Sequence, residues 1–138
     1  GFATNSELII LNSELKMDIL MLSHVAVHVA DVPASEAFYR DVLGLPQLPR
    51  PAFDFPGAWF RLGQVQELHL IGNRTQPVHS HSRGTHFALQ VPDIRAAEAE
   101  LRAKNAAFTG PKQRPDGNWQ IFVQDPDGHY IELCELKS

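Results

Sequence analysis

Four side chains in this sequence have the types and the spacing of a metal site. His24 and His86 stand 62 positions apart (86 minus 24), and His69 and Glu132 stand 63 positions apart (132 minus 69). Neutral imidazoles and an ionised carboxylate form a ligand set suited to zinc, nickel, cobalt, manganese or ferrous iron. These are the protonation states expected near neutral pH, so metal binding would displace few protons.

The near-equal spacing has a simple origin, because the chain repeats itself. Residues 24–40 align with residues 86–102 without a gap, and eight of the seventeen positions are identical. Identity at that level is hard to attribute to chance and indicates an internal duplication. The identical pairs are His24 and His86, Ala26 and Ala88, Val29 and Val91, Asp31 and Asp93, Ala34 and Ala96, Glu36 and Glu98, Ala37 and Ala99, and Arg40 and Arg102.

Each copy has the local pattern of a strand followed by a capped helix. The strands are predicted from short runs of apolar or alternating residues. Asp31 and Asp93 come next, and an aspartate directly before helix-forming residues is typical of an N-cap. The predicted elements are a strand over 25–29 and a helix over 34–42 in the first copy, and a strand over 87–91 and a helix over 94–104 in the second.

A β-hairpin follows each helix. The second hairpin turns at Asp125-Pro-Asp-Gly128, where proline fixes φ and glycine accepts positive φ. Matching Trp59 with Trp119 makes the second hairpin three residues longer than the first. The predicted hairpin strands are 58–62 and 67–71, then 119–124 and 130–133, each preceded by a further strand near Phe53 and near Phe108. Each half is thus βαβββ, and the fold class is α+β.

The duplication also predicts which side chains meet. His69 on the last strand of the first half takes the place of Glu132 in the second, so two-fold-related halves would bring all four ligands together. Glu67 competes with His69, since the two lie on one strand face. His28 shares a strand face with His24 and is a candidate to line the same cavity.

These residues resemble the vicinal-oxygen-chelate superfamily, which includes glyoxalase I, fosfomycin-resistance enzymes, methylmalonyl-CoA epimerase, extradiol dioxygenases and bleomycin-binding proteins. The resemblance covers about residues 22–136, and its motifs are residues 24–27 with 37–45, 85–89 and 125–133. It implies a half-open mixed β barrel around one divalent metal ion, held by His24, His69, His86 and Glu132. It also implies that the metal acts as a Lewis acid on a developing oxyanion and that Glu132 is the catalytic base.

Within that superfamily, the resemblance points first to a glyoxalase-like lyase or isomerase acting on a small oxygenated substrate. Asn73, four residues after His69, matches the lactoylglutathione-lyase pattern and is a candidate substrate contact, together with His28. His69 stands where that group usually has Glu or Gln, and His28 replaces an arginine that would hold glutathione. The sequence therefore does not indicate whether glutathione or another thiol is the co-substrate. The alternatives are a single-domain ferrous-iron extradiol-type dioxygenase and a non-catalytic, bleomycin-resistance-like protein that binds a drug or metabolite.

Length and composition set the remaining expectations. The chain has 138 residues, a net charge of -4 and a pI near 5.9. We expect one domain over residues 21–138, with modules at about 22–73 and 84–136 and an extension over 1–20. Cys134 is the only cysteine, and no basic block, signal-like segment or long apolar run occurs. These features favour a cytoplasmic protein that binds neither nucleic acid nor membrane, and the family resemblance favours a homodimer.

Overall fold

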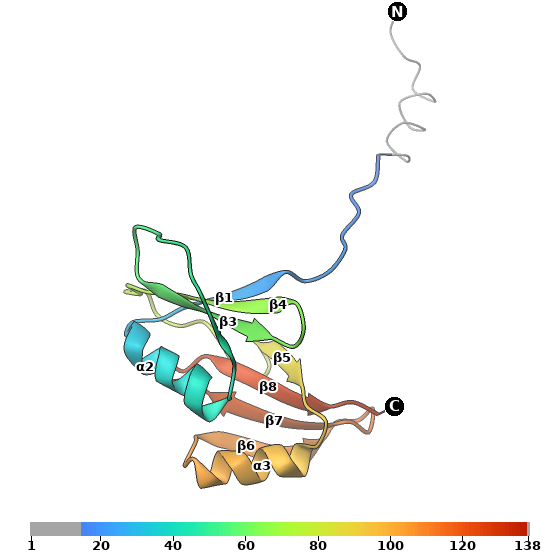
Figure 1. Cartoon of the computed structure of the whole chain (residues 1–138). Coiled ribbons are helices and arrows are strands. Elements are labelled where there is room, and N and C mark those ends of the chain that lie inside the picture. Colours follow the sequence, from blue (N-terminus) through green and yellow to red (C-terminus); the bar gives the residue numbers. More distant parts are fainter. Residues whose placement is uncertain (1–14, 138) are drawn as a thin grey trace, which may run out of the picture.

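The computed structural model describes residues 15–137, which form two copies of one βαβββ unit (Figure 1). The duplication and the α+β class are therefore confirmed. Module 1 contains β1 (His24–His28), α2 (Val32–Ala37), the π-helical turn η1 (Phe38–Val42), β2 (Gln47–Leu48), β3 (Gly57–Leu62) and β4 (Gln66–Ile71). Module 2 contains β5 (Phe87–Gln90), α3 (Ile94–Ala103), β6 (Phe108–Gln113), β7 (Trp119–Gln124) and β8 (Tyr130–Glu135).

Each module builds one four-stranded mixed sheet. Sheet A has the order β1-β4-β3-β2, and sheet B has the equivalent order β5-β8-β7-β6. The first strand of each module pairs in parallel with the last, and the other pairs are antiparallel. β1 and β5 are therefore edge strands, with one hydrogen-bonded side each.

The aspartate caps lie where the sequence predicted them. Asp31 accepts a hydrogen bond from the backbone of Ala34 at 3.2 Å, and Asp93 accepts from Arg95 and Ala96 at 2.9 and 3.1 Å. These caps satisfy amides that a helix start would leave without partners. The first helix consequently begins at Val32, earlier than predicted.

The prediction of a strand near Phe53 is wrong. The second strand of module 1 is the short β2, and the segment 49–56 is a loop. Three prolines in that loop, at positions 49, 51 and 56, explain the difference, because proline has no N–H to donate to a sheet ladder. The corresponding prediction near Phe108 is confirmed by β6.

Strand register corrects the match between the two hairpins. Trp59 lies opposite His69 in sheet A, and Phe122 lies opposite Glu132 in sheet B. Trp59 therefore corresponds to Phe122, ten residues before the last predicted ligand in both modules, and not to Trp119. The span from the aromatic residue to the ligand is thus equal in the two hairpins, and the predicted three-residue difference is wrong.

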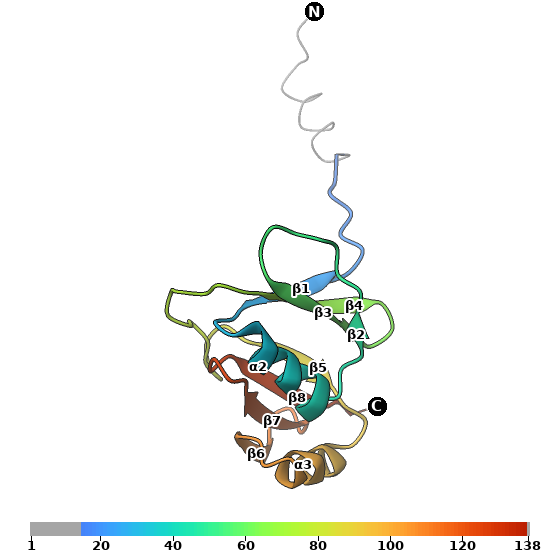
Figure 2. The same cartoon turned by 60° about the vertical axis from the view of Figure 1, so that its left-hand side comes forward.

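One face of each sheet is covered by its own module's helix. In sheet A the side chains on this face include Phe60, Leu68 and Leu70, all essentially inaccessible to solvent. Figures 1 and 2 show α2 beneath sheet A, on the side of module 2, and α3 beneath sheet B. The other face of each sheet is open, and the predicted ligands point to that face by the two-residue alternation of a strand.

Two aspartates of the 125–128 turn tie the modules together. The hydroxyl of Tyr39 donates to Asp125 at 2.8 Å, and burial raises the pKa of this aspartate. Arg74 donates to Asp127 at 2.6 Å, and Asp127 also accepts from the backbone of Ala30 and from Ser35. The turn thus forms an inter-module connection that its sequence did not reveal.

The remaining chain adds little to the site. Of the predicted extension, residues 1–14 lie outside the described part, and residues 15–20 form no helix or strand. Between residues 15 and 137, no helix is long and apolar enough to cross a membrane.

Candidate metal centre

The first pair of predicted ligands lies on the open face of sheet A. The rings of His24 and His69 stack with centroids 4.2 Å apart, because Ala26, two residues after His24, is the register partner of His69. Trp59 stacks on the opposite face of the His69 ring at 4.0 Å, with planes only 4° apart. Glu67 lies 2.8 Å from Nε2 of His69, so the competing carboxylate is also part of this cluster.

The second pair lies on the open face of sheet B. Nε2 of His86 is 3.4 Å from Oε1 of Glu132, whose side chain is only 9% exposed. Nδ1 of His86 lies within 3.2 Å of the backbone carbonyls of His81 and Gly84. Carbonyls only accept, so Nδ1 carries the proton, and the lone pair of Nε2 is directed toward the carboxylate side.

This second pair fits a divalent ion. Two ligands about 2.1 Å from a tetrahedral ion lie about 3.4 Å apart. That is the observed separation between His86 and Glu132. Arg114 donates to the other carboxylate oxygen, Oε2 of Glu132, at 3.3 Å, and metal-binding carboxylates commonly have such a partner. Asp116 holds the Arg114 guanidinium in place with a second, short ion pair.

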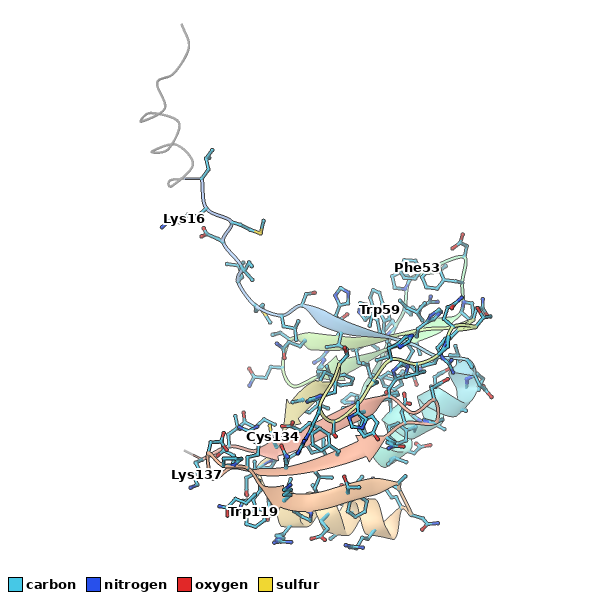
Figure 3. All side chains as sticks on the ribbon, turned by 180° about the vertical axis from the view of Figure 1, so that it is seen from behind. Lys16, Phe53, Trp59, Trp119, Cys134 and Lys137 are labelled. Carbon is cyan, nitrogen blue, oxygen red and sulfur yellow. The ribbon has the colours of Figure 1, made fainter. Side chains whose placement is uncertain are left out.

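The two pairs do not meet in one chain. Within residues 15–137, no group of three or more His, Cys, Asp or Glu side chains is arranged to hold a metal ion. The expectation that all four ligands converge inside a single chain is therefore wrong. Figure 3 shows the reason on the module 1 side: Trp59, which stacks on His69, projects from sheet A away from module 2.

The segment that links the modules lies beside both edge strands, β1 and β5. Linker residues His79, Ser80 and Thr85 line a cavity of about 200 Å³ together with residues of both edge strands. Ser80 accepts a hydrogen bond from the backbone of Tyr130 at 2.9 Å. The linker is thus anchored to module 2 at the start of β8.

The predicted substrate contacts occupy different surroundings. His28 donates from Nε2 to the carbonyl of Gly72 at 3.0 Å and lines the 200 Å³ cavity together with His86, whereas His24 is not among the residues that line it. Asn73 has a φ of 62° and is exposed, so it serves a left-handed turn at the end of β4. No contact in the described chain joins Asn73 to a predicted ligand, and its substrate role stays a prediction.

A polar cavity of about 370 Å³ adjoins Glu132 on sheet B. Its cationic members are Arg83 and Lys112, and the full lining is Ser82, Arg83, Thr109, Gly110, Lys112, Gln120, Phe122 and Glu132. Sequence reasoning missed this cavity and Arg114, since the cations come from separate segments that only the fold brings together. It also missed Phe53 and Phe55 near Trp59, which the predicted strand would have placed differently.

Residues 21–133 match the Glyoxalase/Bleomycin resistance protein/Dioxygenase superfamily, which is most of the chain. The chain belongs to this superfamily. The family match and the duplicated βαβββ architecture agree with each other, and the resemblance stated from the sequence is confirmed.

Individual relatives of the superfamily differ in their named activities. The chain is 31% identical over 128 residues to a probable lactoylglutathione lyase of Synechocystis sp., covering 86% of this chain and 98% of that protein. It is 26% identical over 120 residues to the metallothiol transferase FosB of Bacillus licheniformis, covering 83% and 75%. A solved glyoxalase family protein from Bacillus anthracis superposes with a TM-score of 0.76 at 28% identity, covering 89% of this chain and all of that one.

Proposed function

We propose that this chain is a divalent-metal-dependent enzyme of the glyoxalase type, a lyase or isomerase acting on a small oxygenated substrate. We further propose that a homodimer completes the metal centre. His24 and His69 of one protomer and His86 and Glu132 of its partner would hold each ion, giving two equivalent centres per dimer.

One observation carries this proposal: the four candidate ligands form two pairs at repeat-equivalent register positions. Ala26 faces His69 in sheet A, and Ala88 faces Glu132 in sheet B. Each pair lies on an open sheet face, close to an edge strand that has hydrogen-bonded pairing on one side only. Two copies related by a two-fold axis could therefore bring β1 of each beside β5 of the other. Each β1–β5 contact would place the module 1 pair of one protomer next to the module 2 pair of its partner.

The residues around Glu132 support a role in moving a proton. When bound, a divalent ion supplies Lewis-acid stabilisation to an oxyanion of the substrate. Glu132 would be the base that takes the substrate proton. Arg114 fixes the orientation of that carboxylate from Oε2 and leaves Oε1 on the side of His86. The protein environment thus gives the two oxygens of Glu132 different surroundings.

Mixed dimers test the shared centre directly. One chain carries His24→Ala with His69→Ala, and the other carries His86→Ala with Glu132→Ala. Each variant alone should retain no zinc after loading and desalting, because every centre in its homodimer lacks one pair. Co-expressed chains with different tags, purified as the mixed dimer, should retain one zinc per dimer, in the centre with both native pairs.

The control is wild type, which should retain one ion per chain. A mixed dimer that retains no ion while wild type retains one would place the centre within a single chain. Wild type that retains no ion would overturn the metal-dependent function and favour a binding protein.

The second candidate is oxygen-dependent cleavage of a catechol-like ring with ferrous iron. The aromatic cluster of Trp59, Phe53 and Phe55 beside His69 favours it. Selective retention of iron over zinc and nickel, with oxygen consumption on a catechol, would distinguish it from the first candidate.

A further inference from the structure

An unbroken series of aromatic rings runs from His24, which is itself exposed, across sheet A to the loop of residues 49–56. His24 stacks on His69, and His69 stacks on Trp59. Phe53 lies next, with its centroid 6.1 Å from that of Trp59, and Phe55 stacks on Phe53 at 5.2 Å. Figure 3 shows Phe53 and Trp59 beside each other on the outer side of sheet A.

The loop end of this series is exposed. Phe53 is 46% exposed, and Phe55 is 37% exposed. Two adjacent phenylalanines at such exposure leave apolar surface in water, which costs free energy. A single exposed ring would be ordinary, but here the exposed rings continue directly onto a predicted metal ligand.

The loop that presents these rings is held in place before any ligand arrives. The Arg50 guanidinium lies over both phenylalanine rings, at 4.8 and 5.0 Å, and donates to the carbonyl of Phe55 at 2.8 Å. The backbone of Phe53 donates to Pro51 at 2.9 Å. Prolines on both sides further restrict the loop. A fixed loop loses little entropy on binding, as a preformed recognition surface should.

Module 2 also has a series of aromatic rings, from His86 through Phe122 and Tyr130 to His81, but its described residues include no loop of exposed phenylalanines. At the position that matches Trp59 it has Phe122, which meets His86 edge to face at 5.2 Å. Beyond Phe122 lies the polar cavity with Arg83 and Lys112. The loop of exposed phenylalanines is thus specific to module 1 among the described residues, and the duplicated fold alone does not account for it.

We propose that the substrate carries an aromatic ring, which binds against Phe53, Phe55 and Trp59 while two neighbouring oxygens of the substrate reach the metal. This inference rests on the proposed metal centre and adds the class of substrate to it. Aromatic rings gain from offset or edge-to-face contacts in addition to the burial of apolar area. In the site, the aromatic surface lies next to the ligand pair. A substrate with a flat ring joined to a chelating group would therefore contact both at once.

Two matched chelators provide the test. Acetohydroxamate and benzohydroxamate bind a divalent ion through the same two oxygens, and only the second carries a ring. Binding is measured on zinc-loaded dimer by calorimetry and by quenching of Trp59 fluorescence, with Trp119→Phe removing the other tryptophan. We expect wild type to bind benzohydroxamate about tenfold more tightly than acetohydroxamate, after correction for their affinities for free zinc.

Variants assign that preference to the loop. Phe53→Ala should reduce the ring preference to less than about threefold and leave acetohydroxamate binding unchanged. Phe53→Leu keeps apolar volume without a ring and should lose a large part of the preference. Val65→Ala, an exposed apolar position on the β3–β4 hairpin, is the matched control and should keep it.

Three results would overturn the inference. Equal affinities for the two chelators in wild type would show that no ring is recognised. A dimer that dissociates on Phe53→Ala, seen by sedimentation, would assign the exposed rings to the partner protomer. Failure of zinc-loaded wild type to bind either chelator would reject the proposed function itself, and the inference with it. In the first two outcomes, by contrast, wild type still retains zinc and still binds acetohydroxamate.

Discussion

The two modules share a backbone plan and differ in what surrounds their ligand pairs. In module 1, His69 lies between the rings of His24 and Trp59, and the neighbourhood continues into exposed phenylalanines. In module 2, Glu132 lies among polar groups, with Arg114 on one carboxylate oxygen. The module 1 pair therefore lies against stacked rings and the Glu67 carboxylate, whereas the module 2 pair lies against an edge-on phenylalanine and the Arg114 guanidinium.

This difference separates two kinds of constraint on a duplicated protein. Ligand positions follow from strand register, which both copies inherit, so His69 and Glu132 remain equivalent although their chemistry differs. Part of the surroundings of each ligand comes from loop residues, such as Phe53 in module 1 and Arg114 in module 2, and these loops have diverged. We infer that the shared part serves the metal and that the divergent part serves the substrate.

The largest expected effect tests whether both modules serve one ion. His69→Ala in module 1 and Glu132→Ala in module 2 should each weaken zinc binding by more than about a hundredfold. Mutating a residue that only hydrogen-bonds to a metal ligand already lowers metal affinity by about 10- to 100-fold. Affinity is measured by competition with a calibrated chelator. Glu67→Gln keeps the shape of the competing carboxylate and should change affinity by about tenfold or less.

A larger loss of zinc affinity in Glu67→Gln than in His69→Ala would change the ligand set. If Glu67→Gln abolishes zinc binding and His69→Ala does not, then Glu67 is the fourth ligand. A loss confined to the module 2 variant would mean that module 1 contributes nothing to the ion, and the comparison between the modules would fail.

The next effect concerns the link between the modules. Arg74 and Asp127 form an ion pair at 2.6 Å with side chains only 18% and 6% exposed. Arg74→Ala should lower the free energy of unfolding by about 3 kcal/mol, since it leaves a poorly exposed carboxylate without its charged partner. Urea denaturation measures this, and Arg61→Ala, at an exposed position of β3, is the matched control with a small expected change.

The same pair predicts a pH dependence with a defined sign. Burial alone would raise the pKa of Asp127, but hydrogen bonds from Arg74, Ala30 and Ser35 outweigh burial and lower it. A lowered pKa in the folded state contributes stability above the ordinary aspartate value of about 4, and that contribution is lost as pH falls through the folded pKa. The slope of stability below about pH 4 should be shallower in Arg74→Ala, and an unchanged slope would contradict this assignment.

The smallest effect sharpens the role of the charged surroundings in module 2. Arg114→Gln should weaken zinc binding by about tenfold, because Glu132 would lose the group that orients its Oε2. Arg83→Gln changes a cation that lines the polar cavity beside Glu132 and has no described ion pair with Glu132; it is the control and should leave zinc affinity unchanged. Equal effects of the two variants would indicate only a general contribution of positive charge.

Much of the fold could be predicted because it rests on local chemistry. Asp31 and Asp93 each precede helix-forming residues, and an N-cap acts on amides within three positions of itself. Strand alternation likewise depends on adjacent residues, so the faces occupied by His24 and His69 followed from the sequence. The duplication then related the two halves and identified the equivalence of His69 with Glu132.

Other features depend on contacts between distant segments. The sequence predicted residues 125–128 only as a hairpin turn, yet Asp125 and Asp127 bind Tyr39 and Arg74, which lie outside module 2. The match of Trp59 with Trp119 compared residue types, whereas register showed that Phe122 is its equivalent. A hairpin shifted by three residues keeps plausible residue types, so only the observed pairing could correct it.

The sequence alone determined the family, the duplicated βαβββ plan and the four candidate ligands, because each of these depends on residue type and short-range order. Only the tertiary structure decided that the ligands form two separate pairs. The direction in which a sheet's open face points depends on how the modules pack, and that packing is set by the buried side chains of α2 and by the ties at Asp125 and Asp127. These contacts join residues far apart in the sequence, so no local pattern could indicate on which side of the molecule each half of the site would lie.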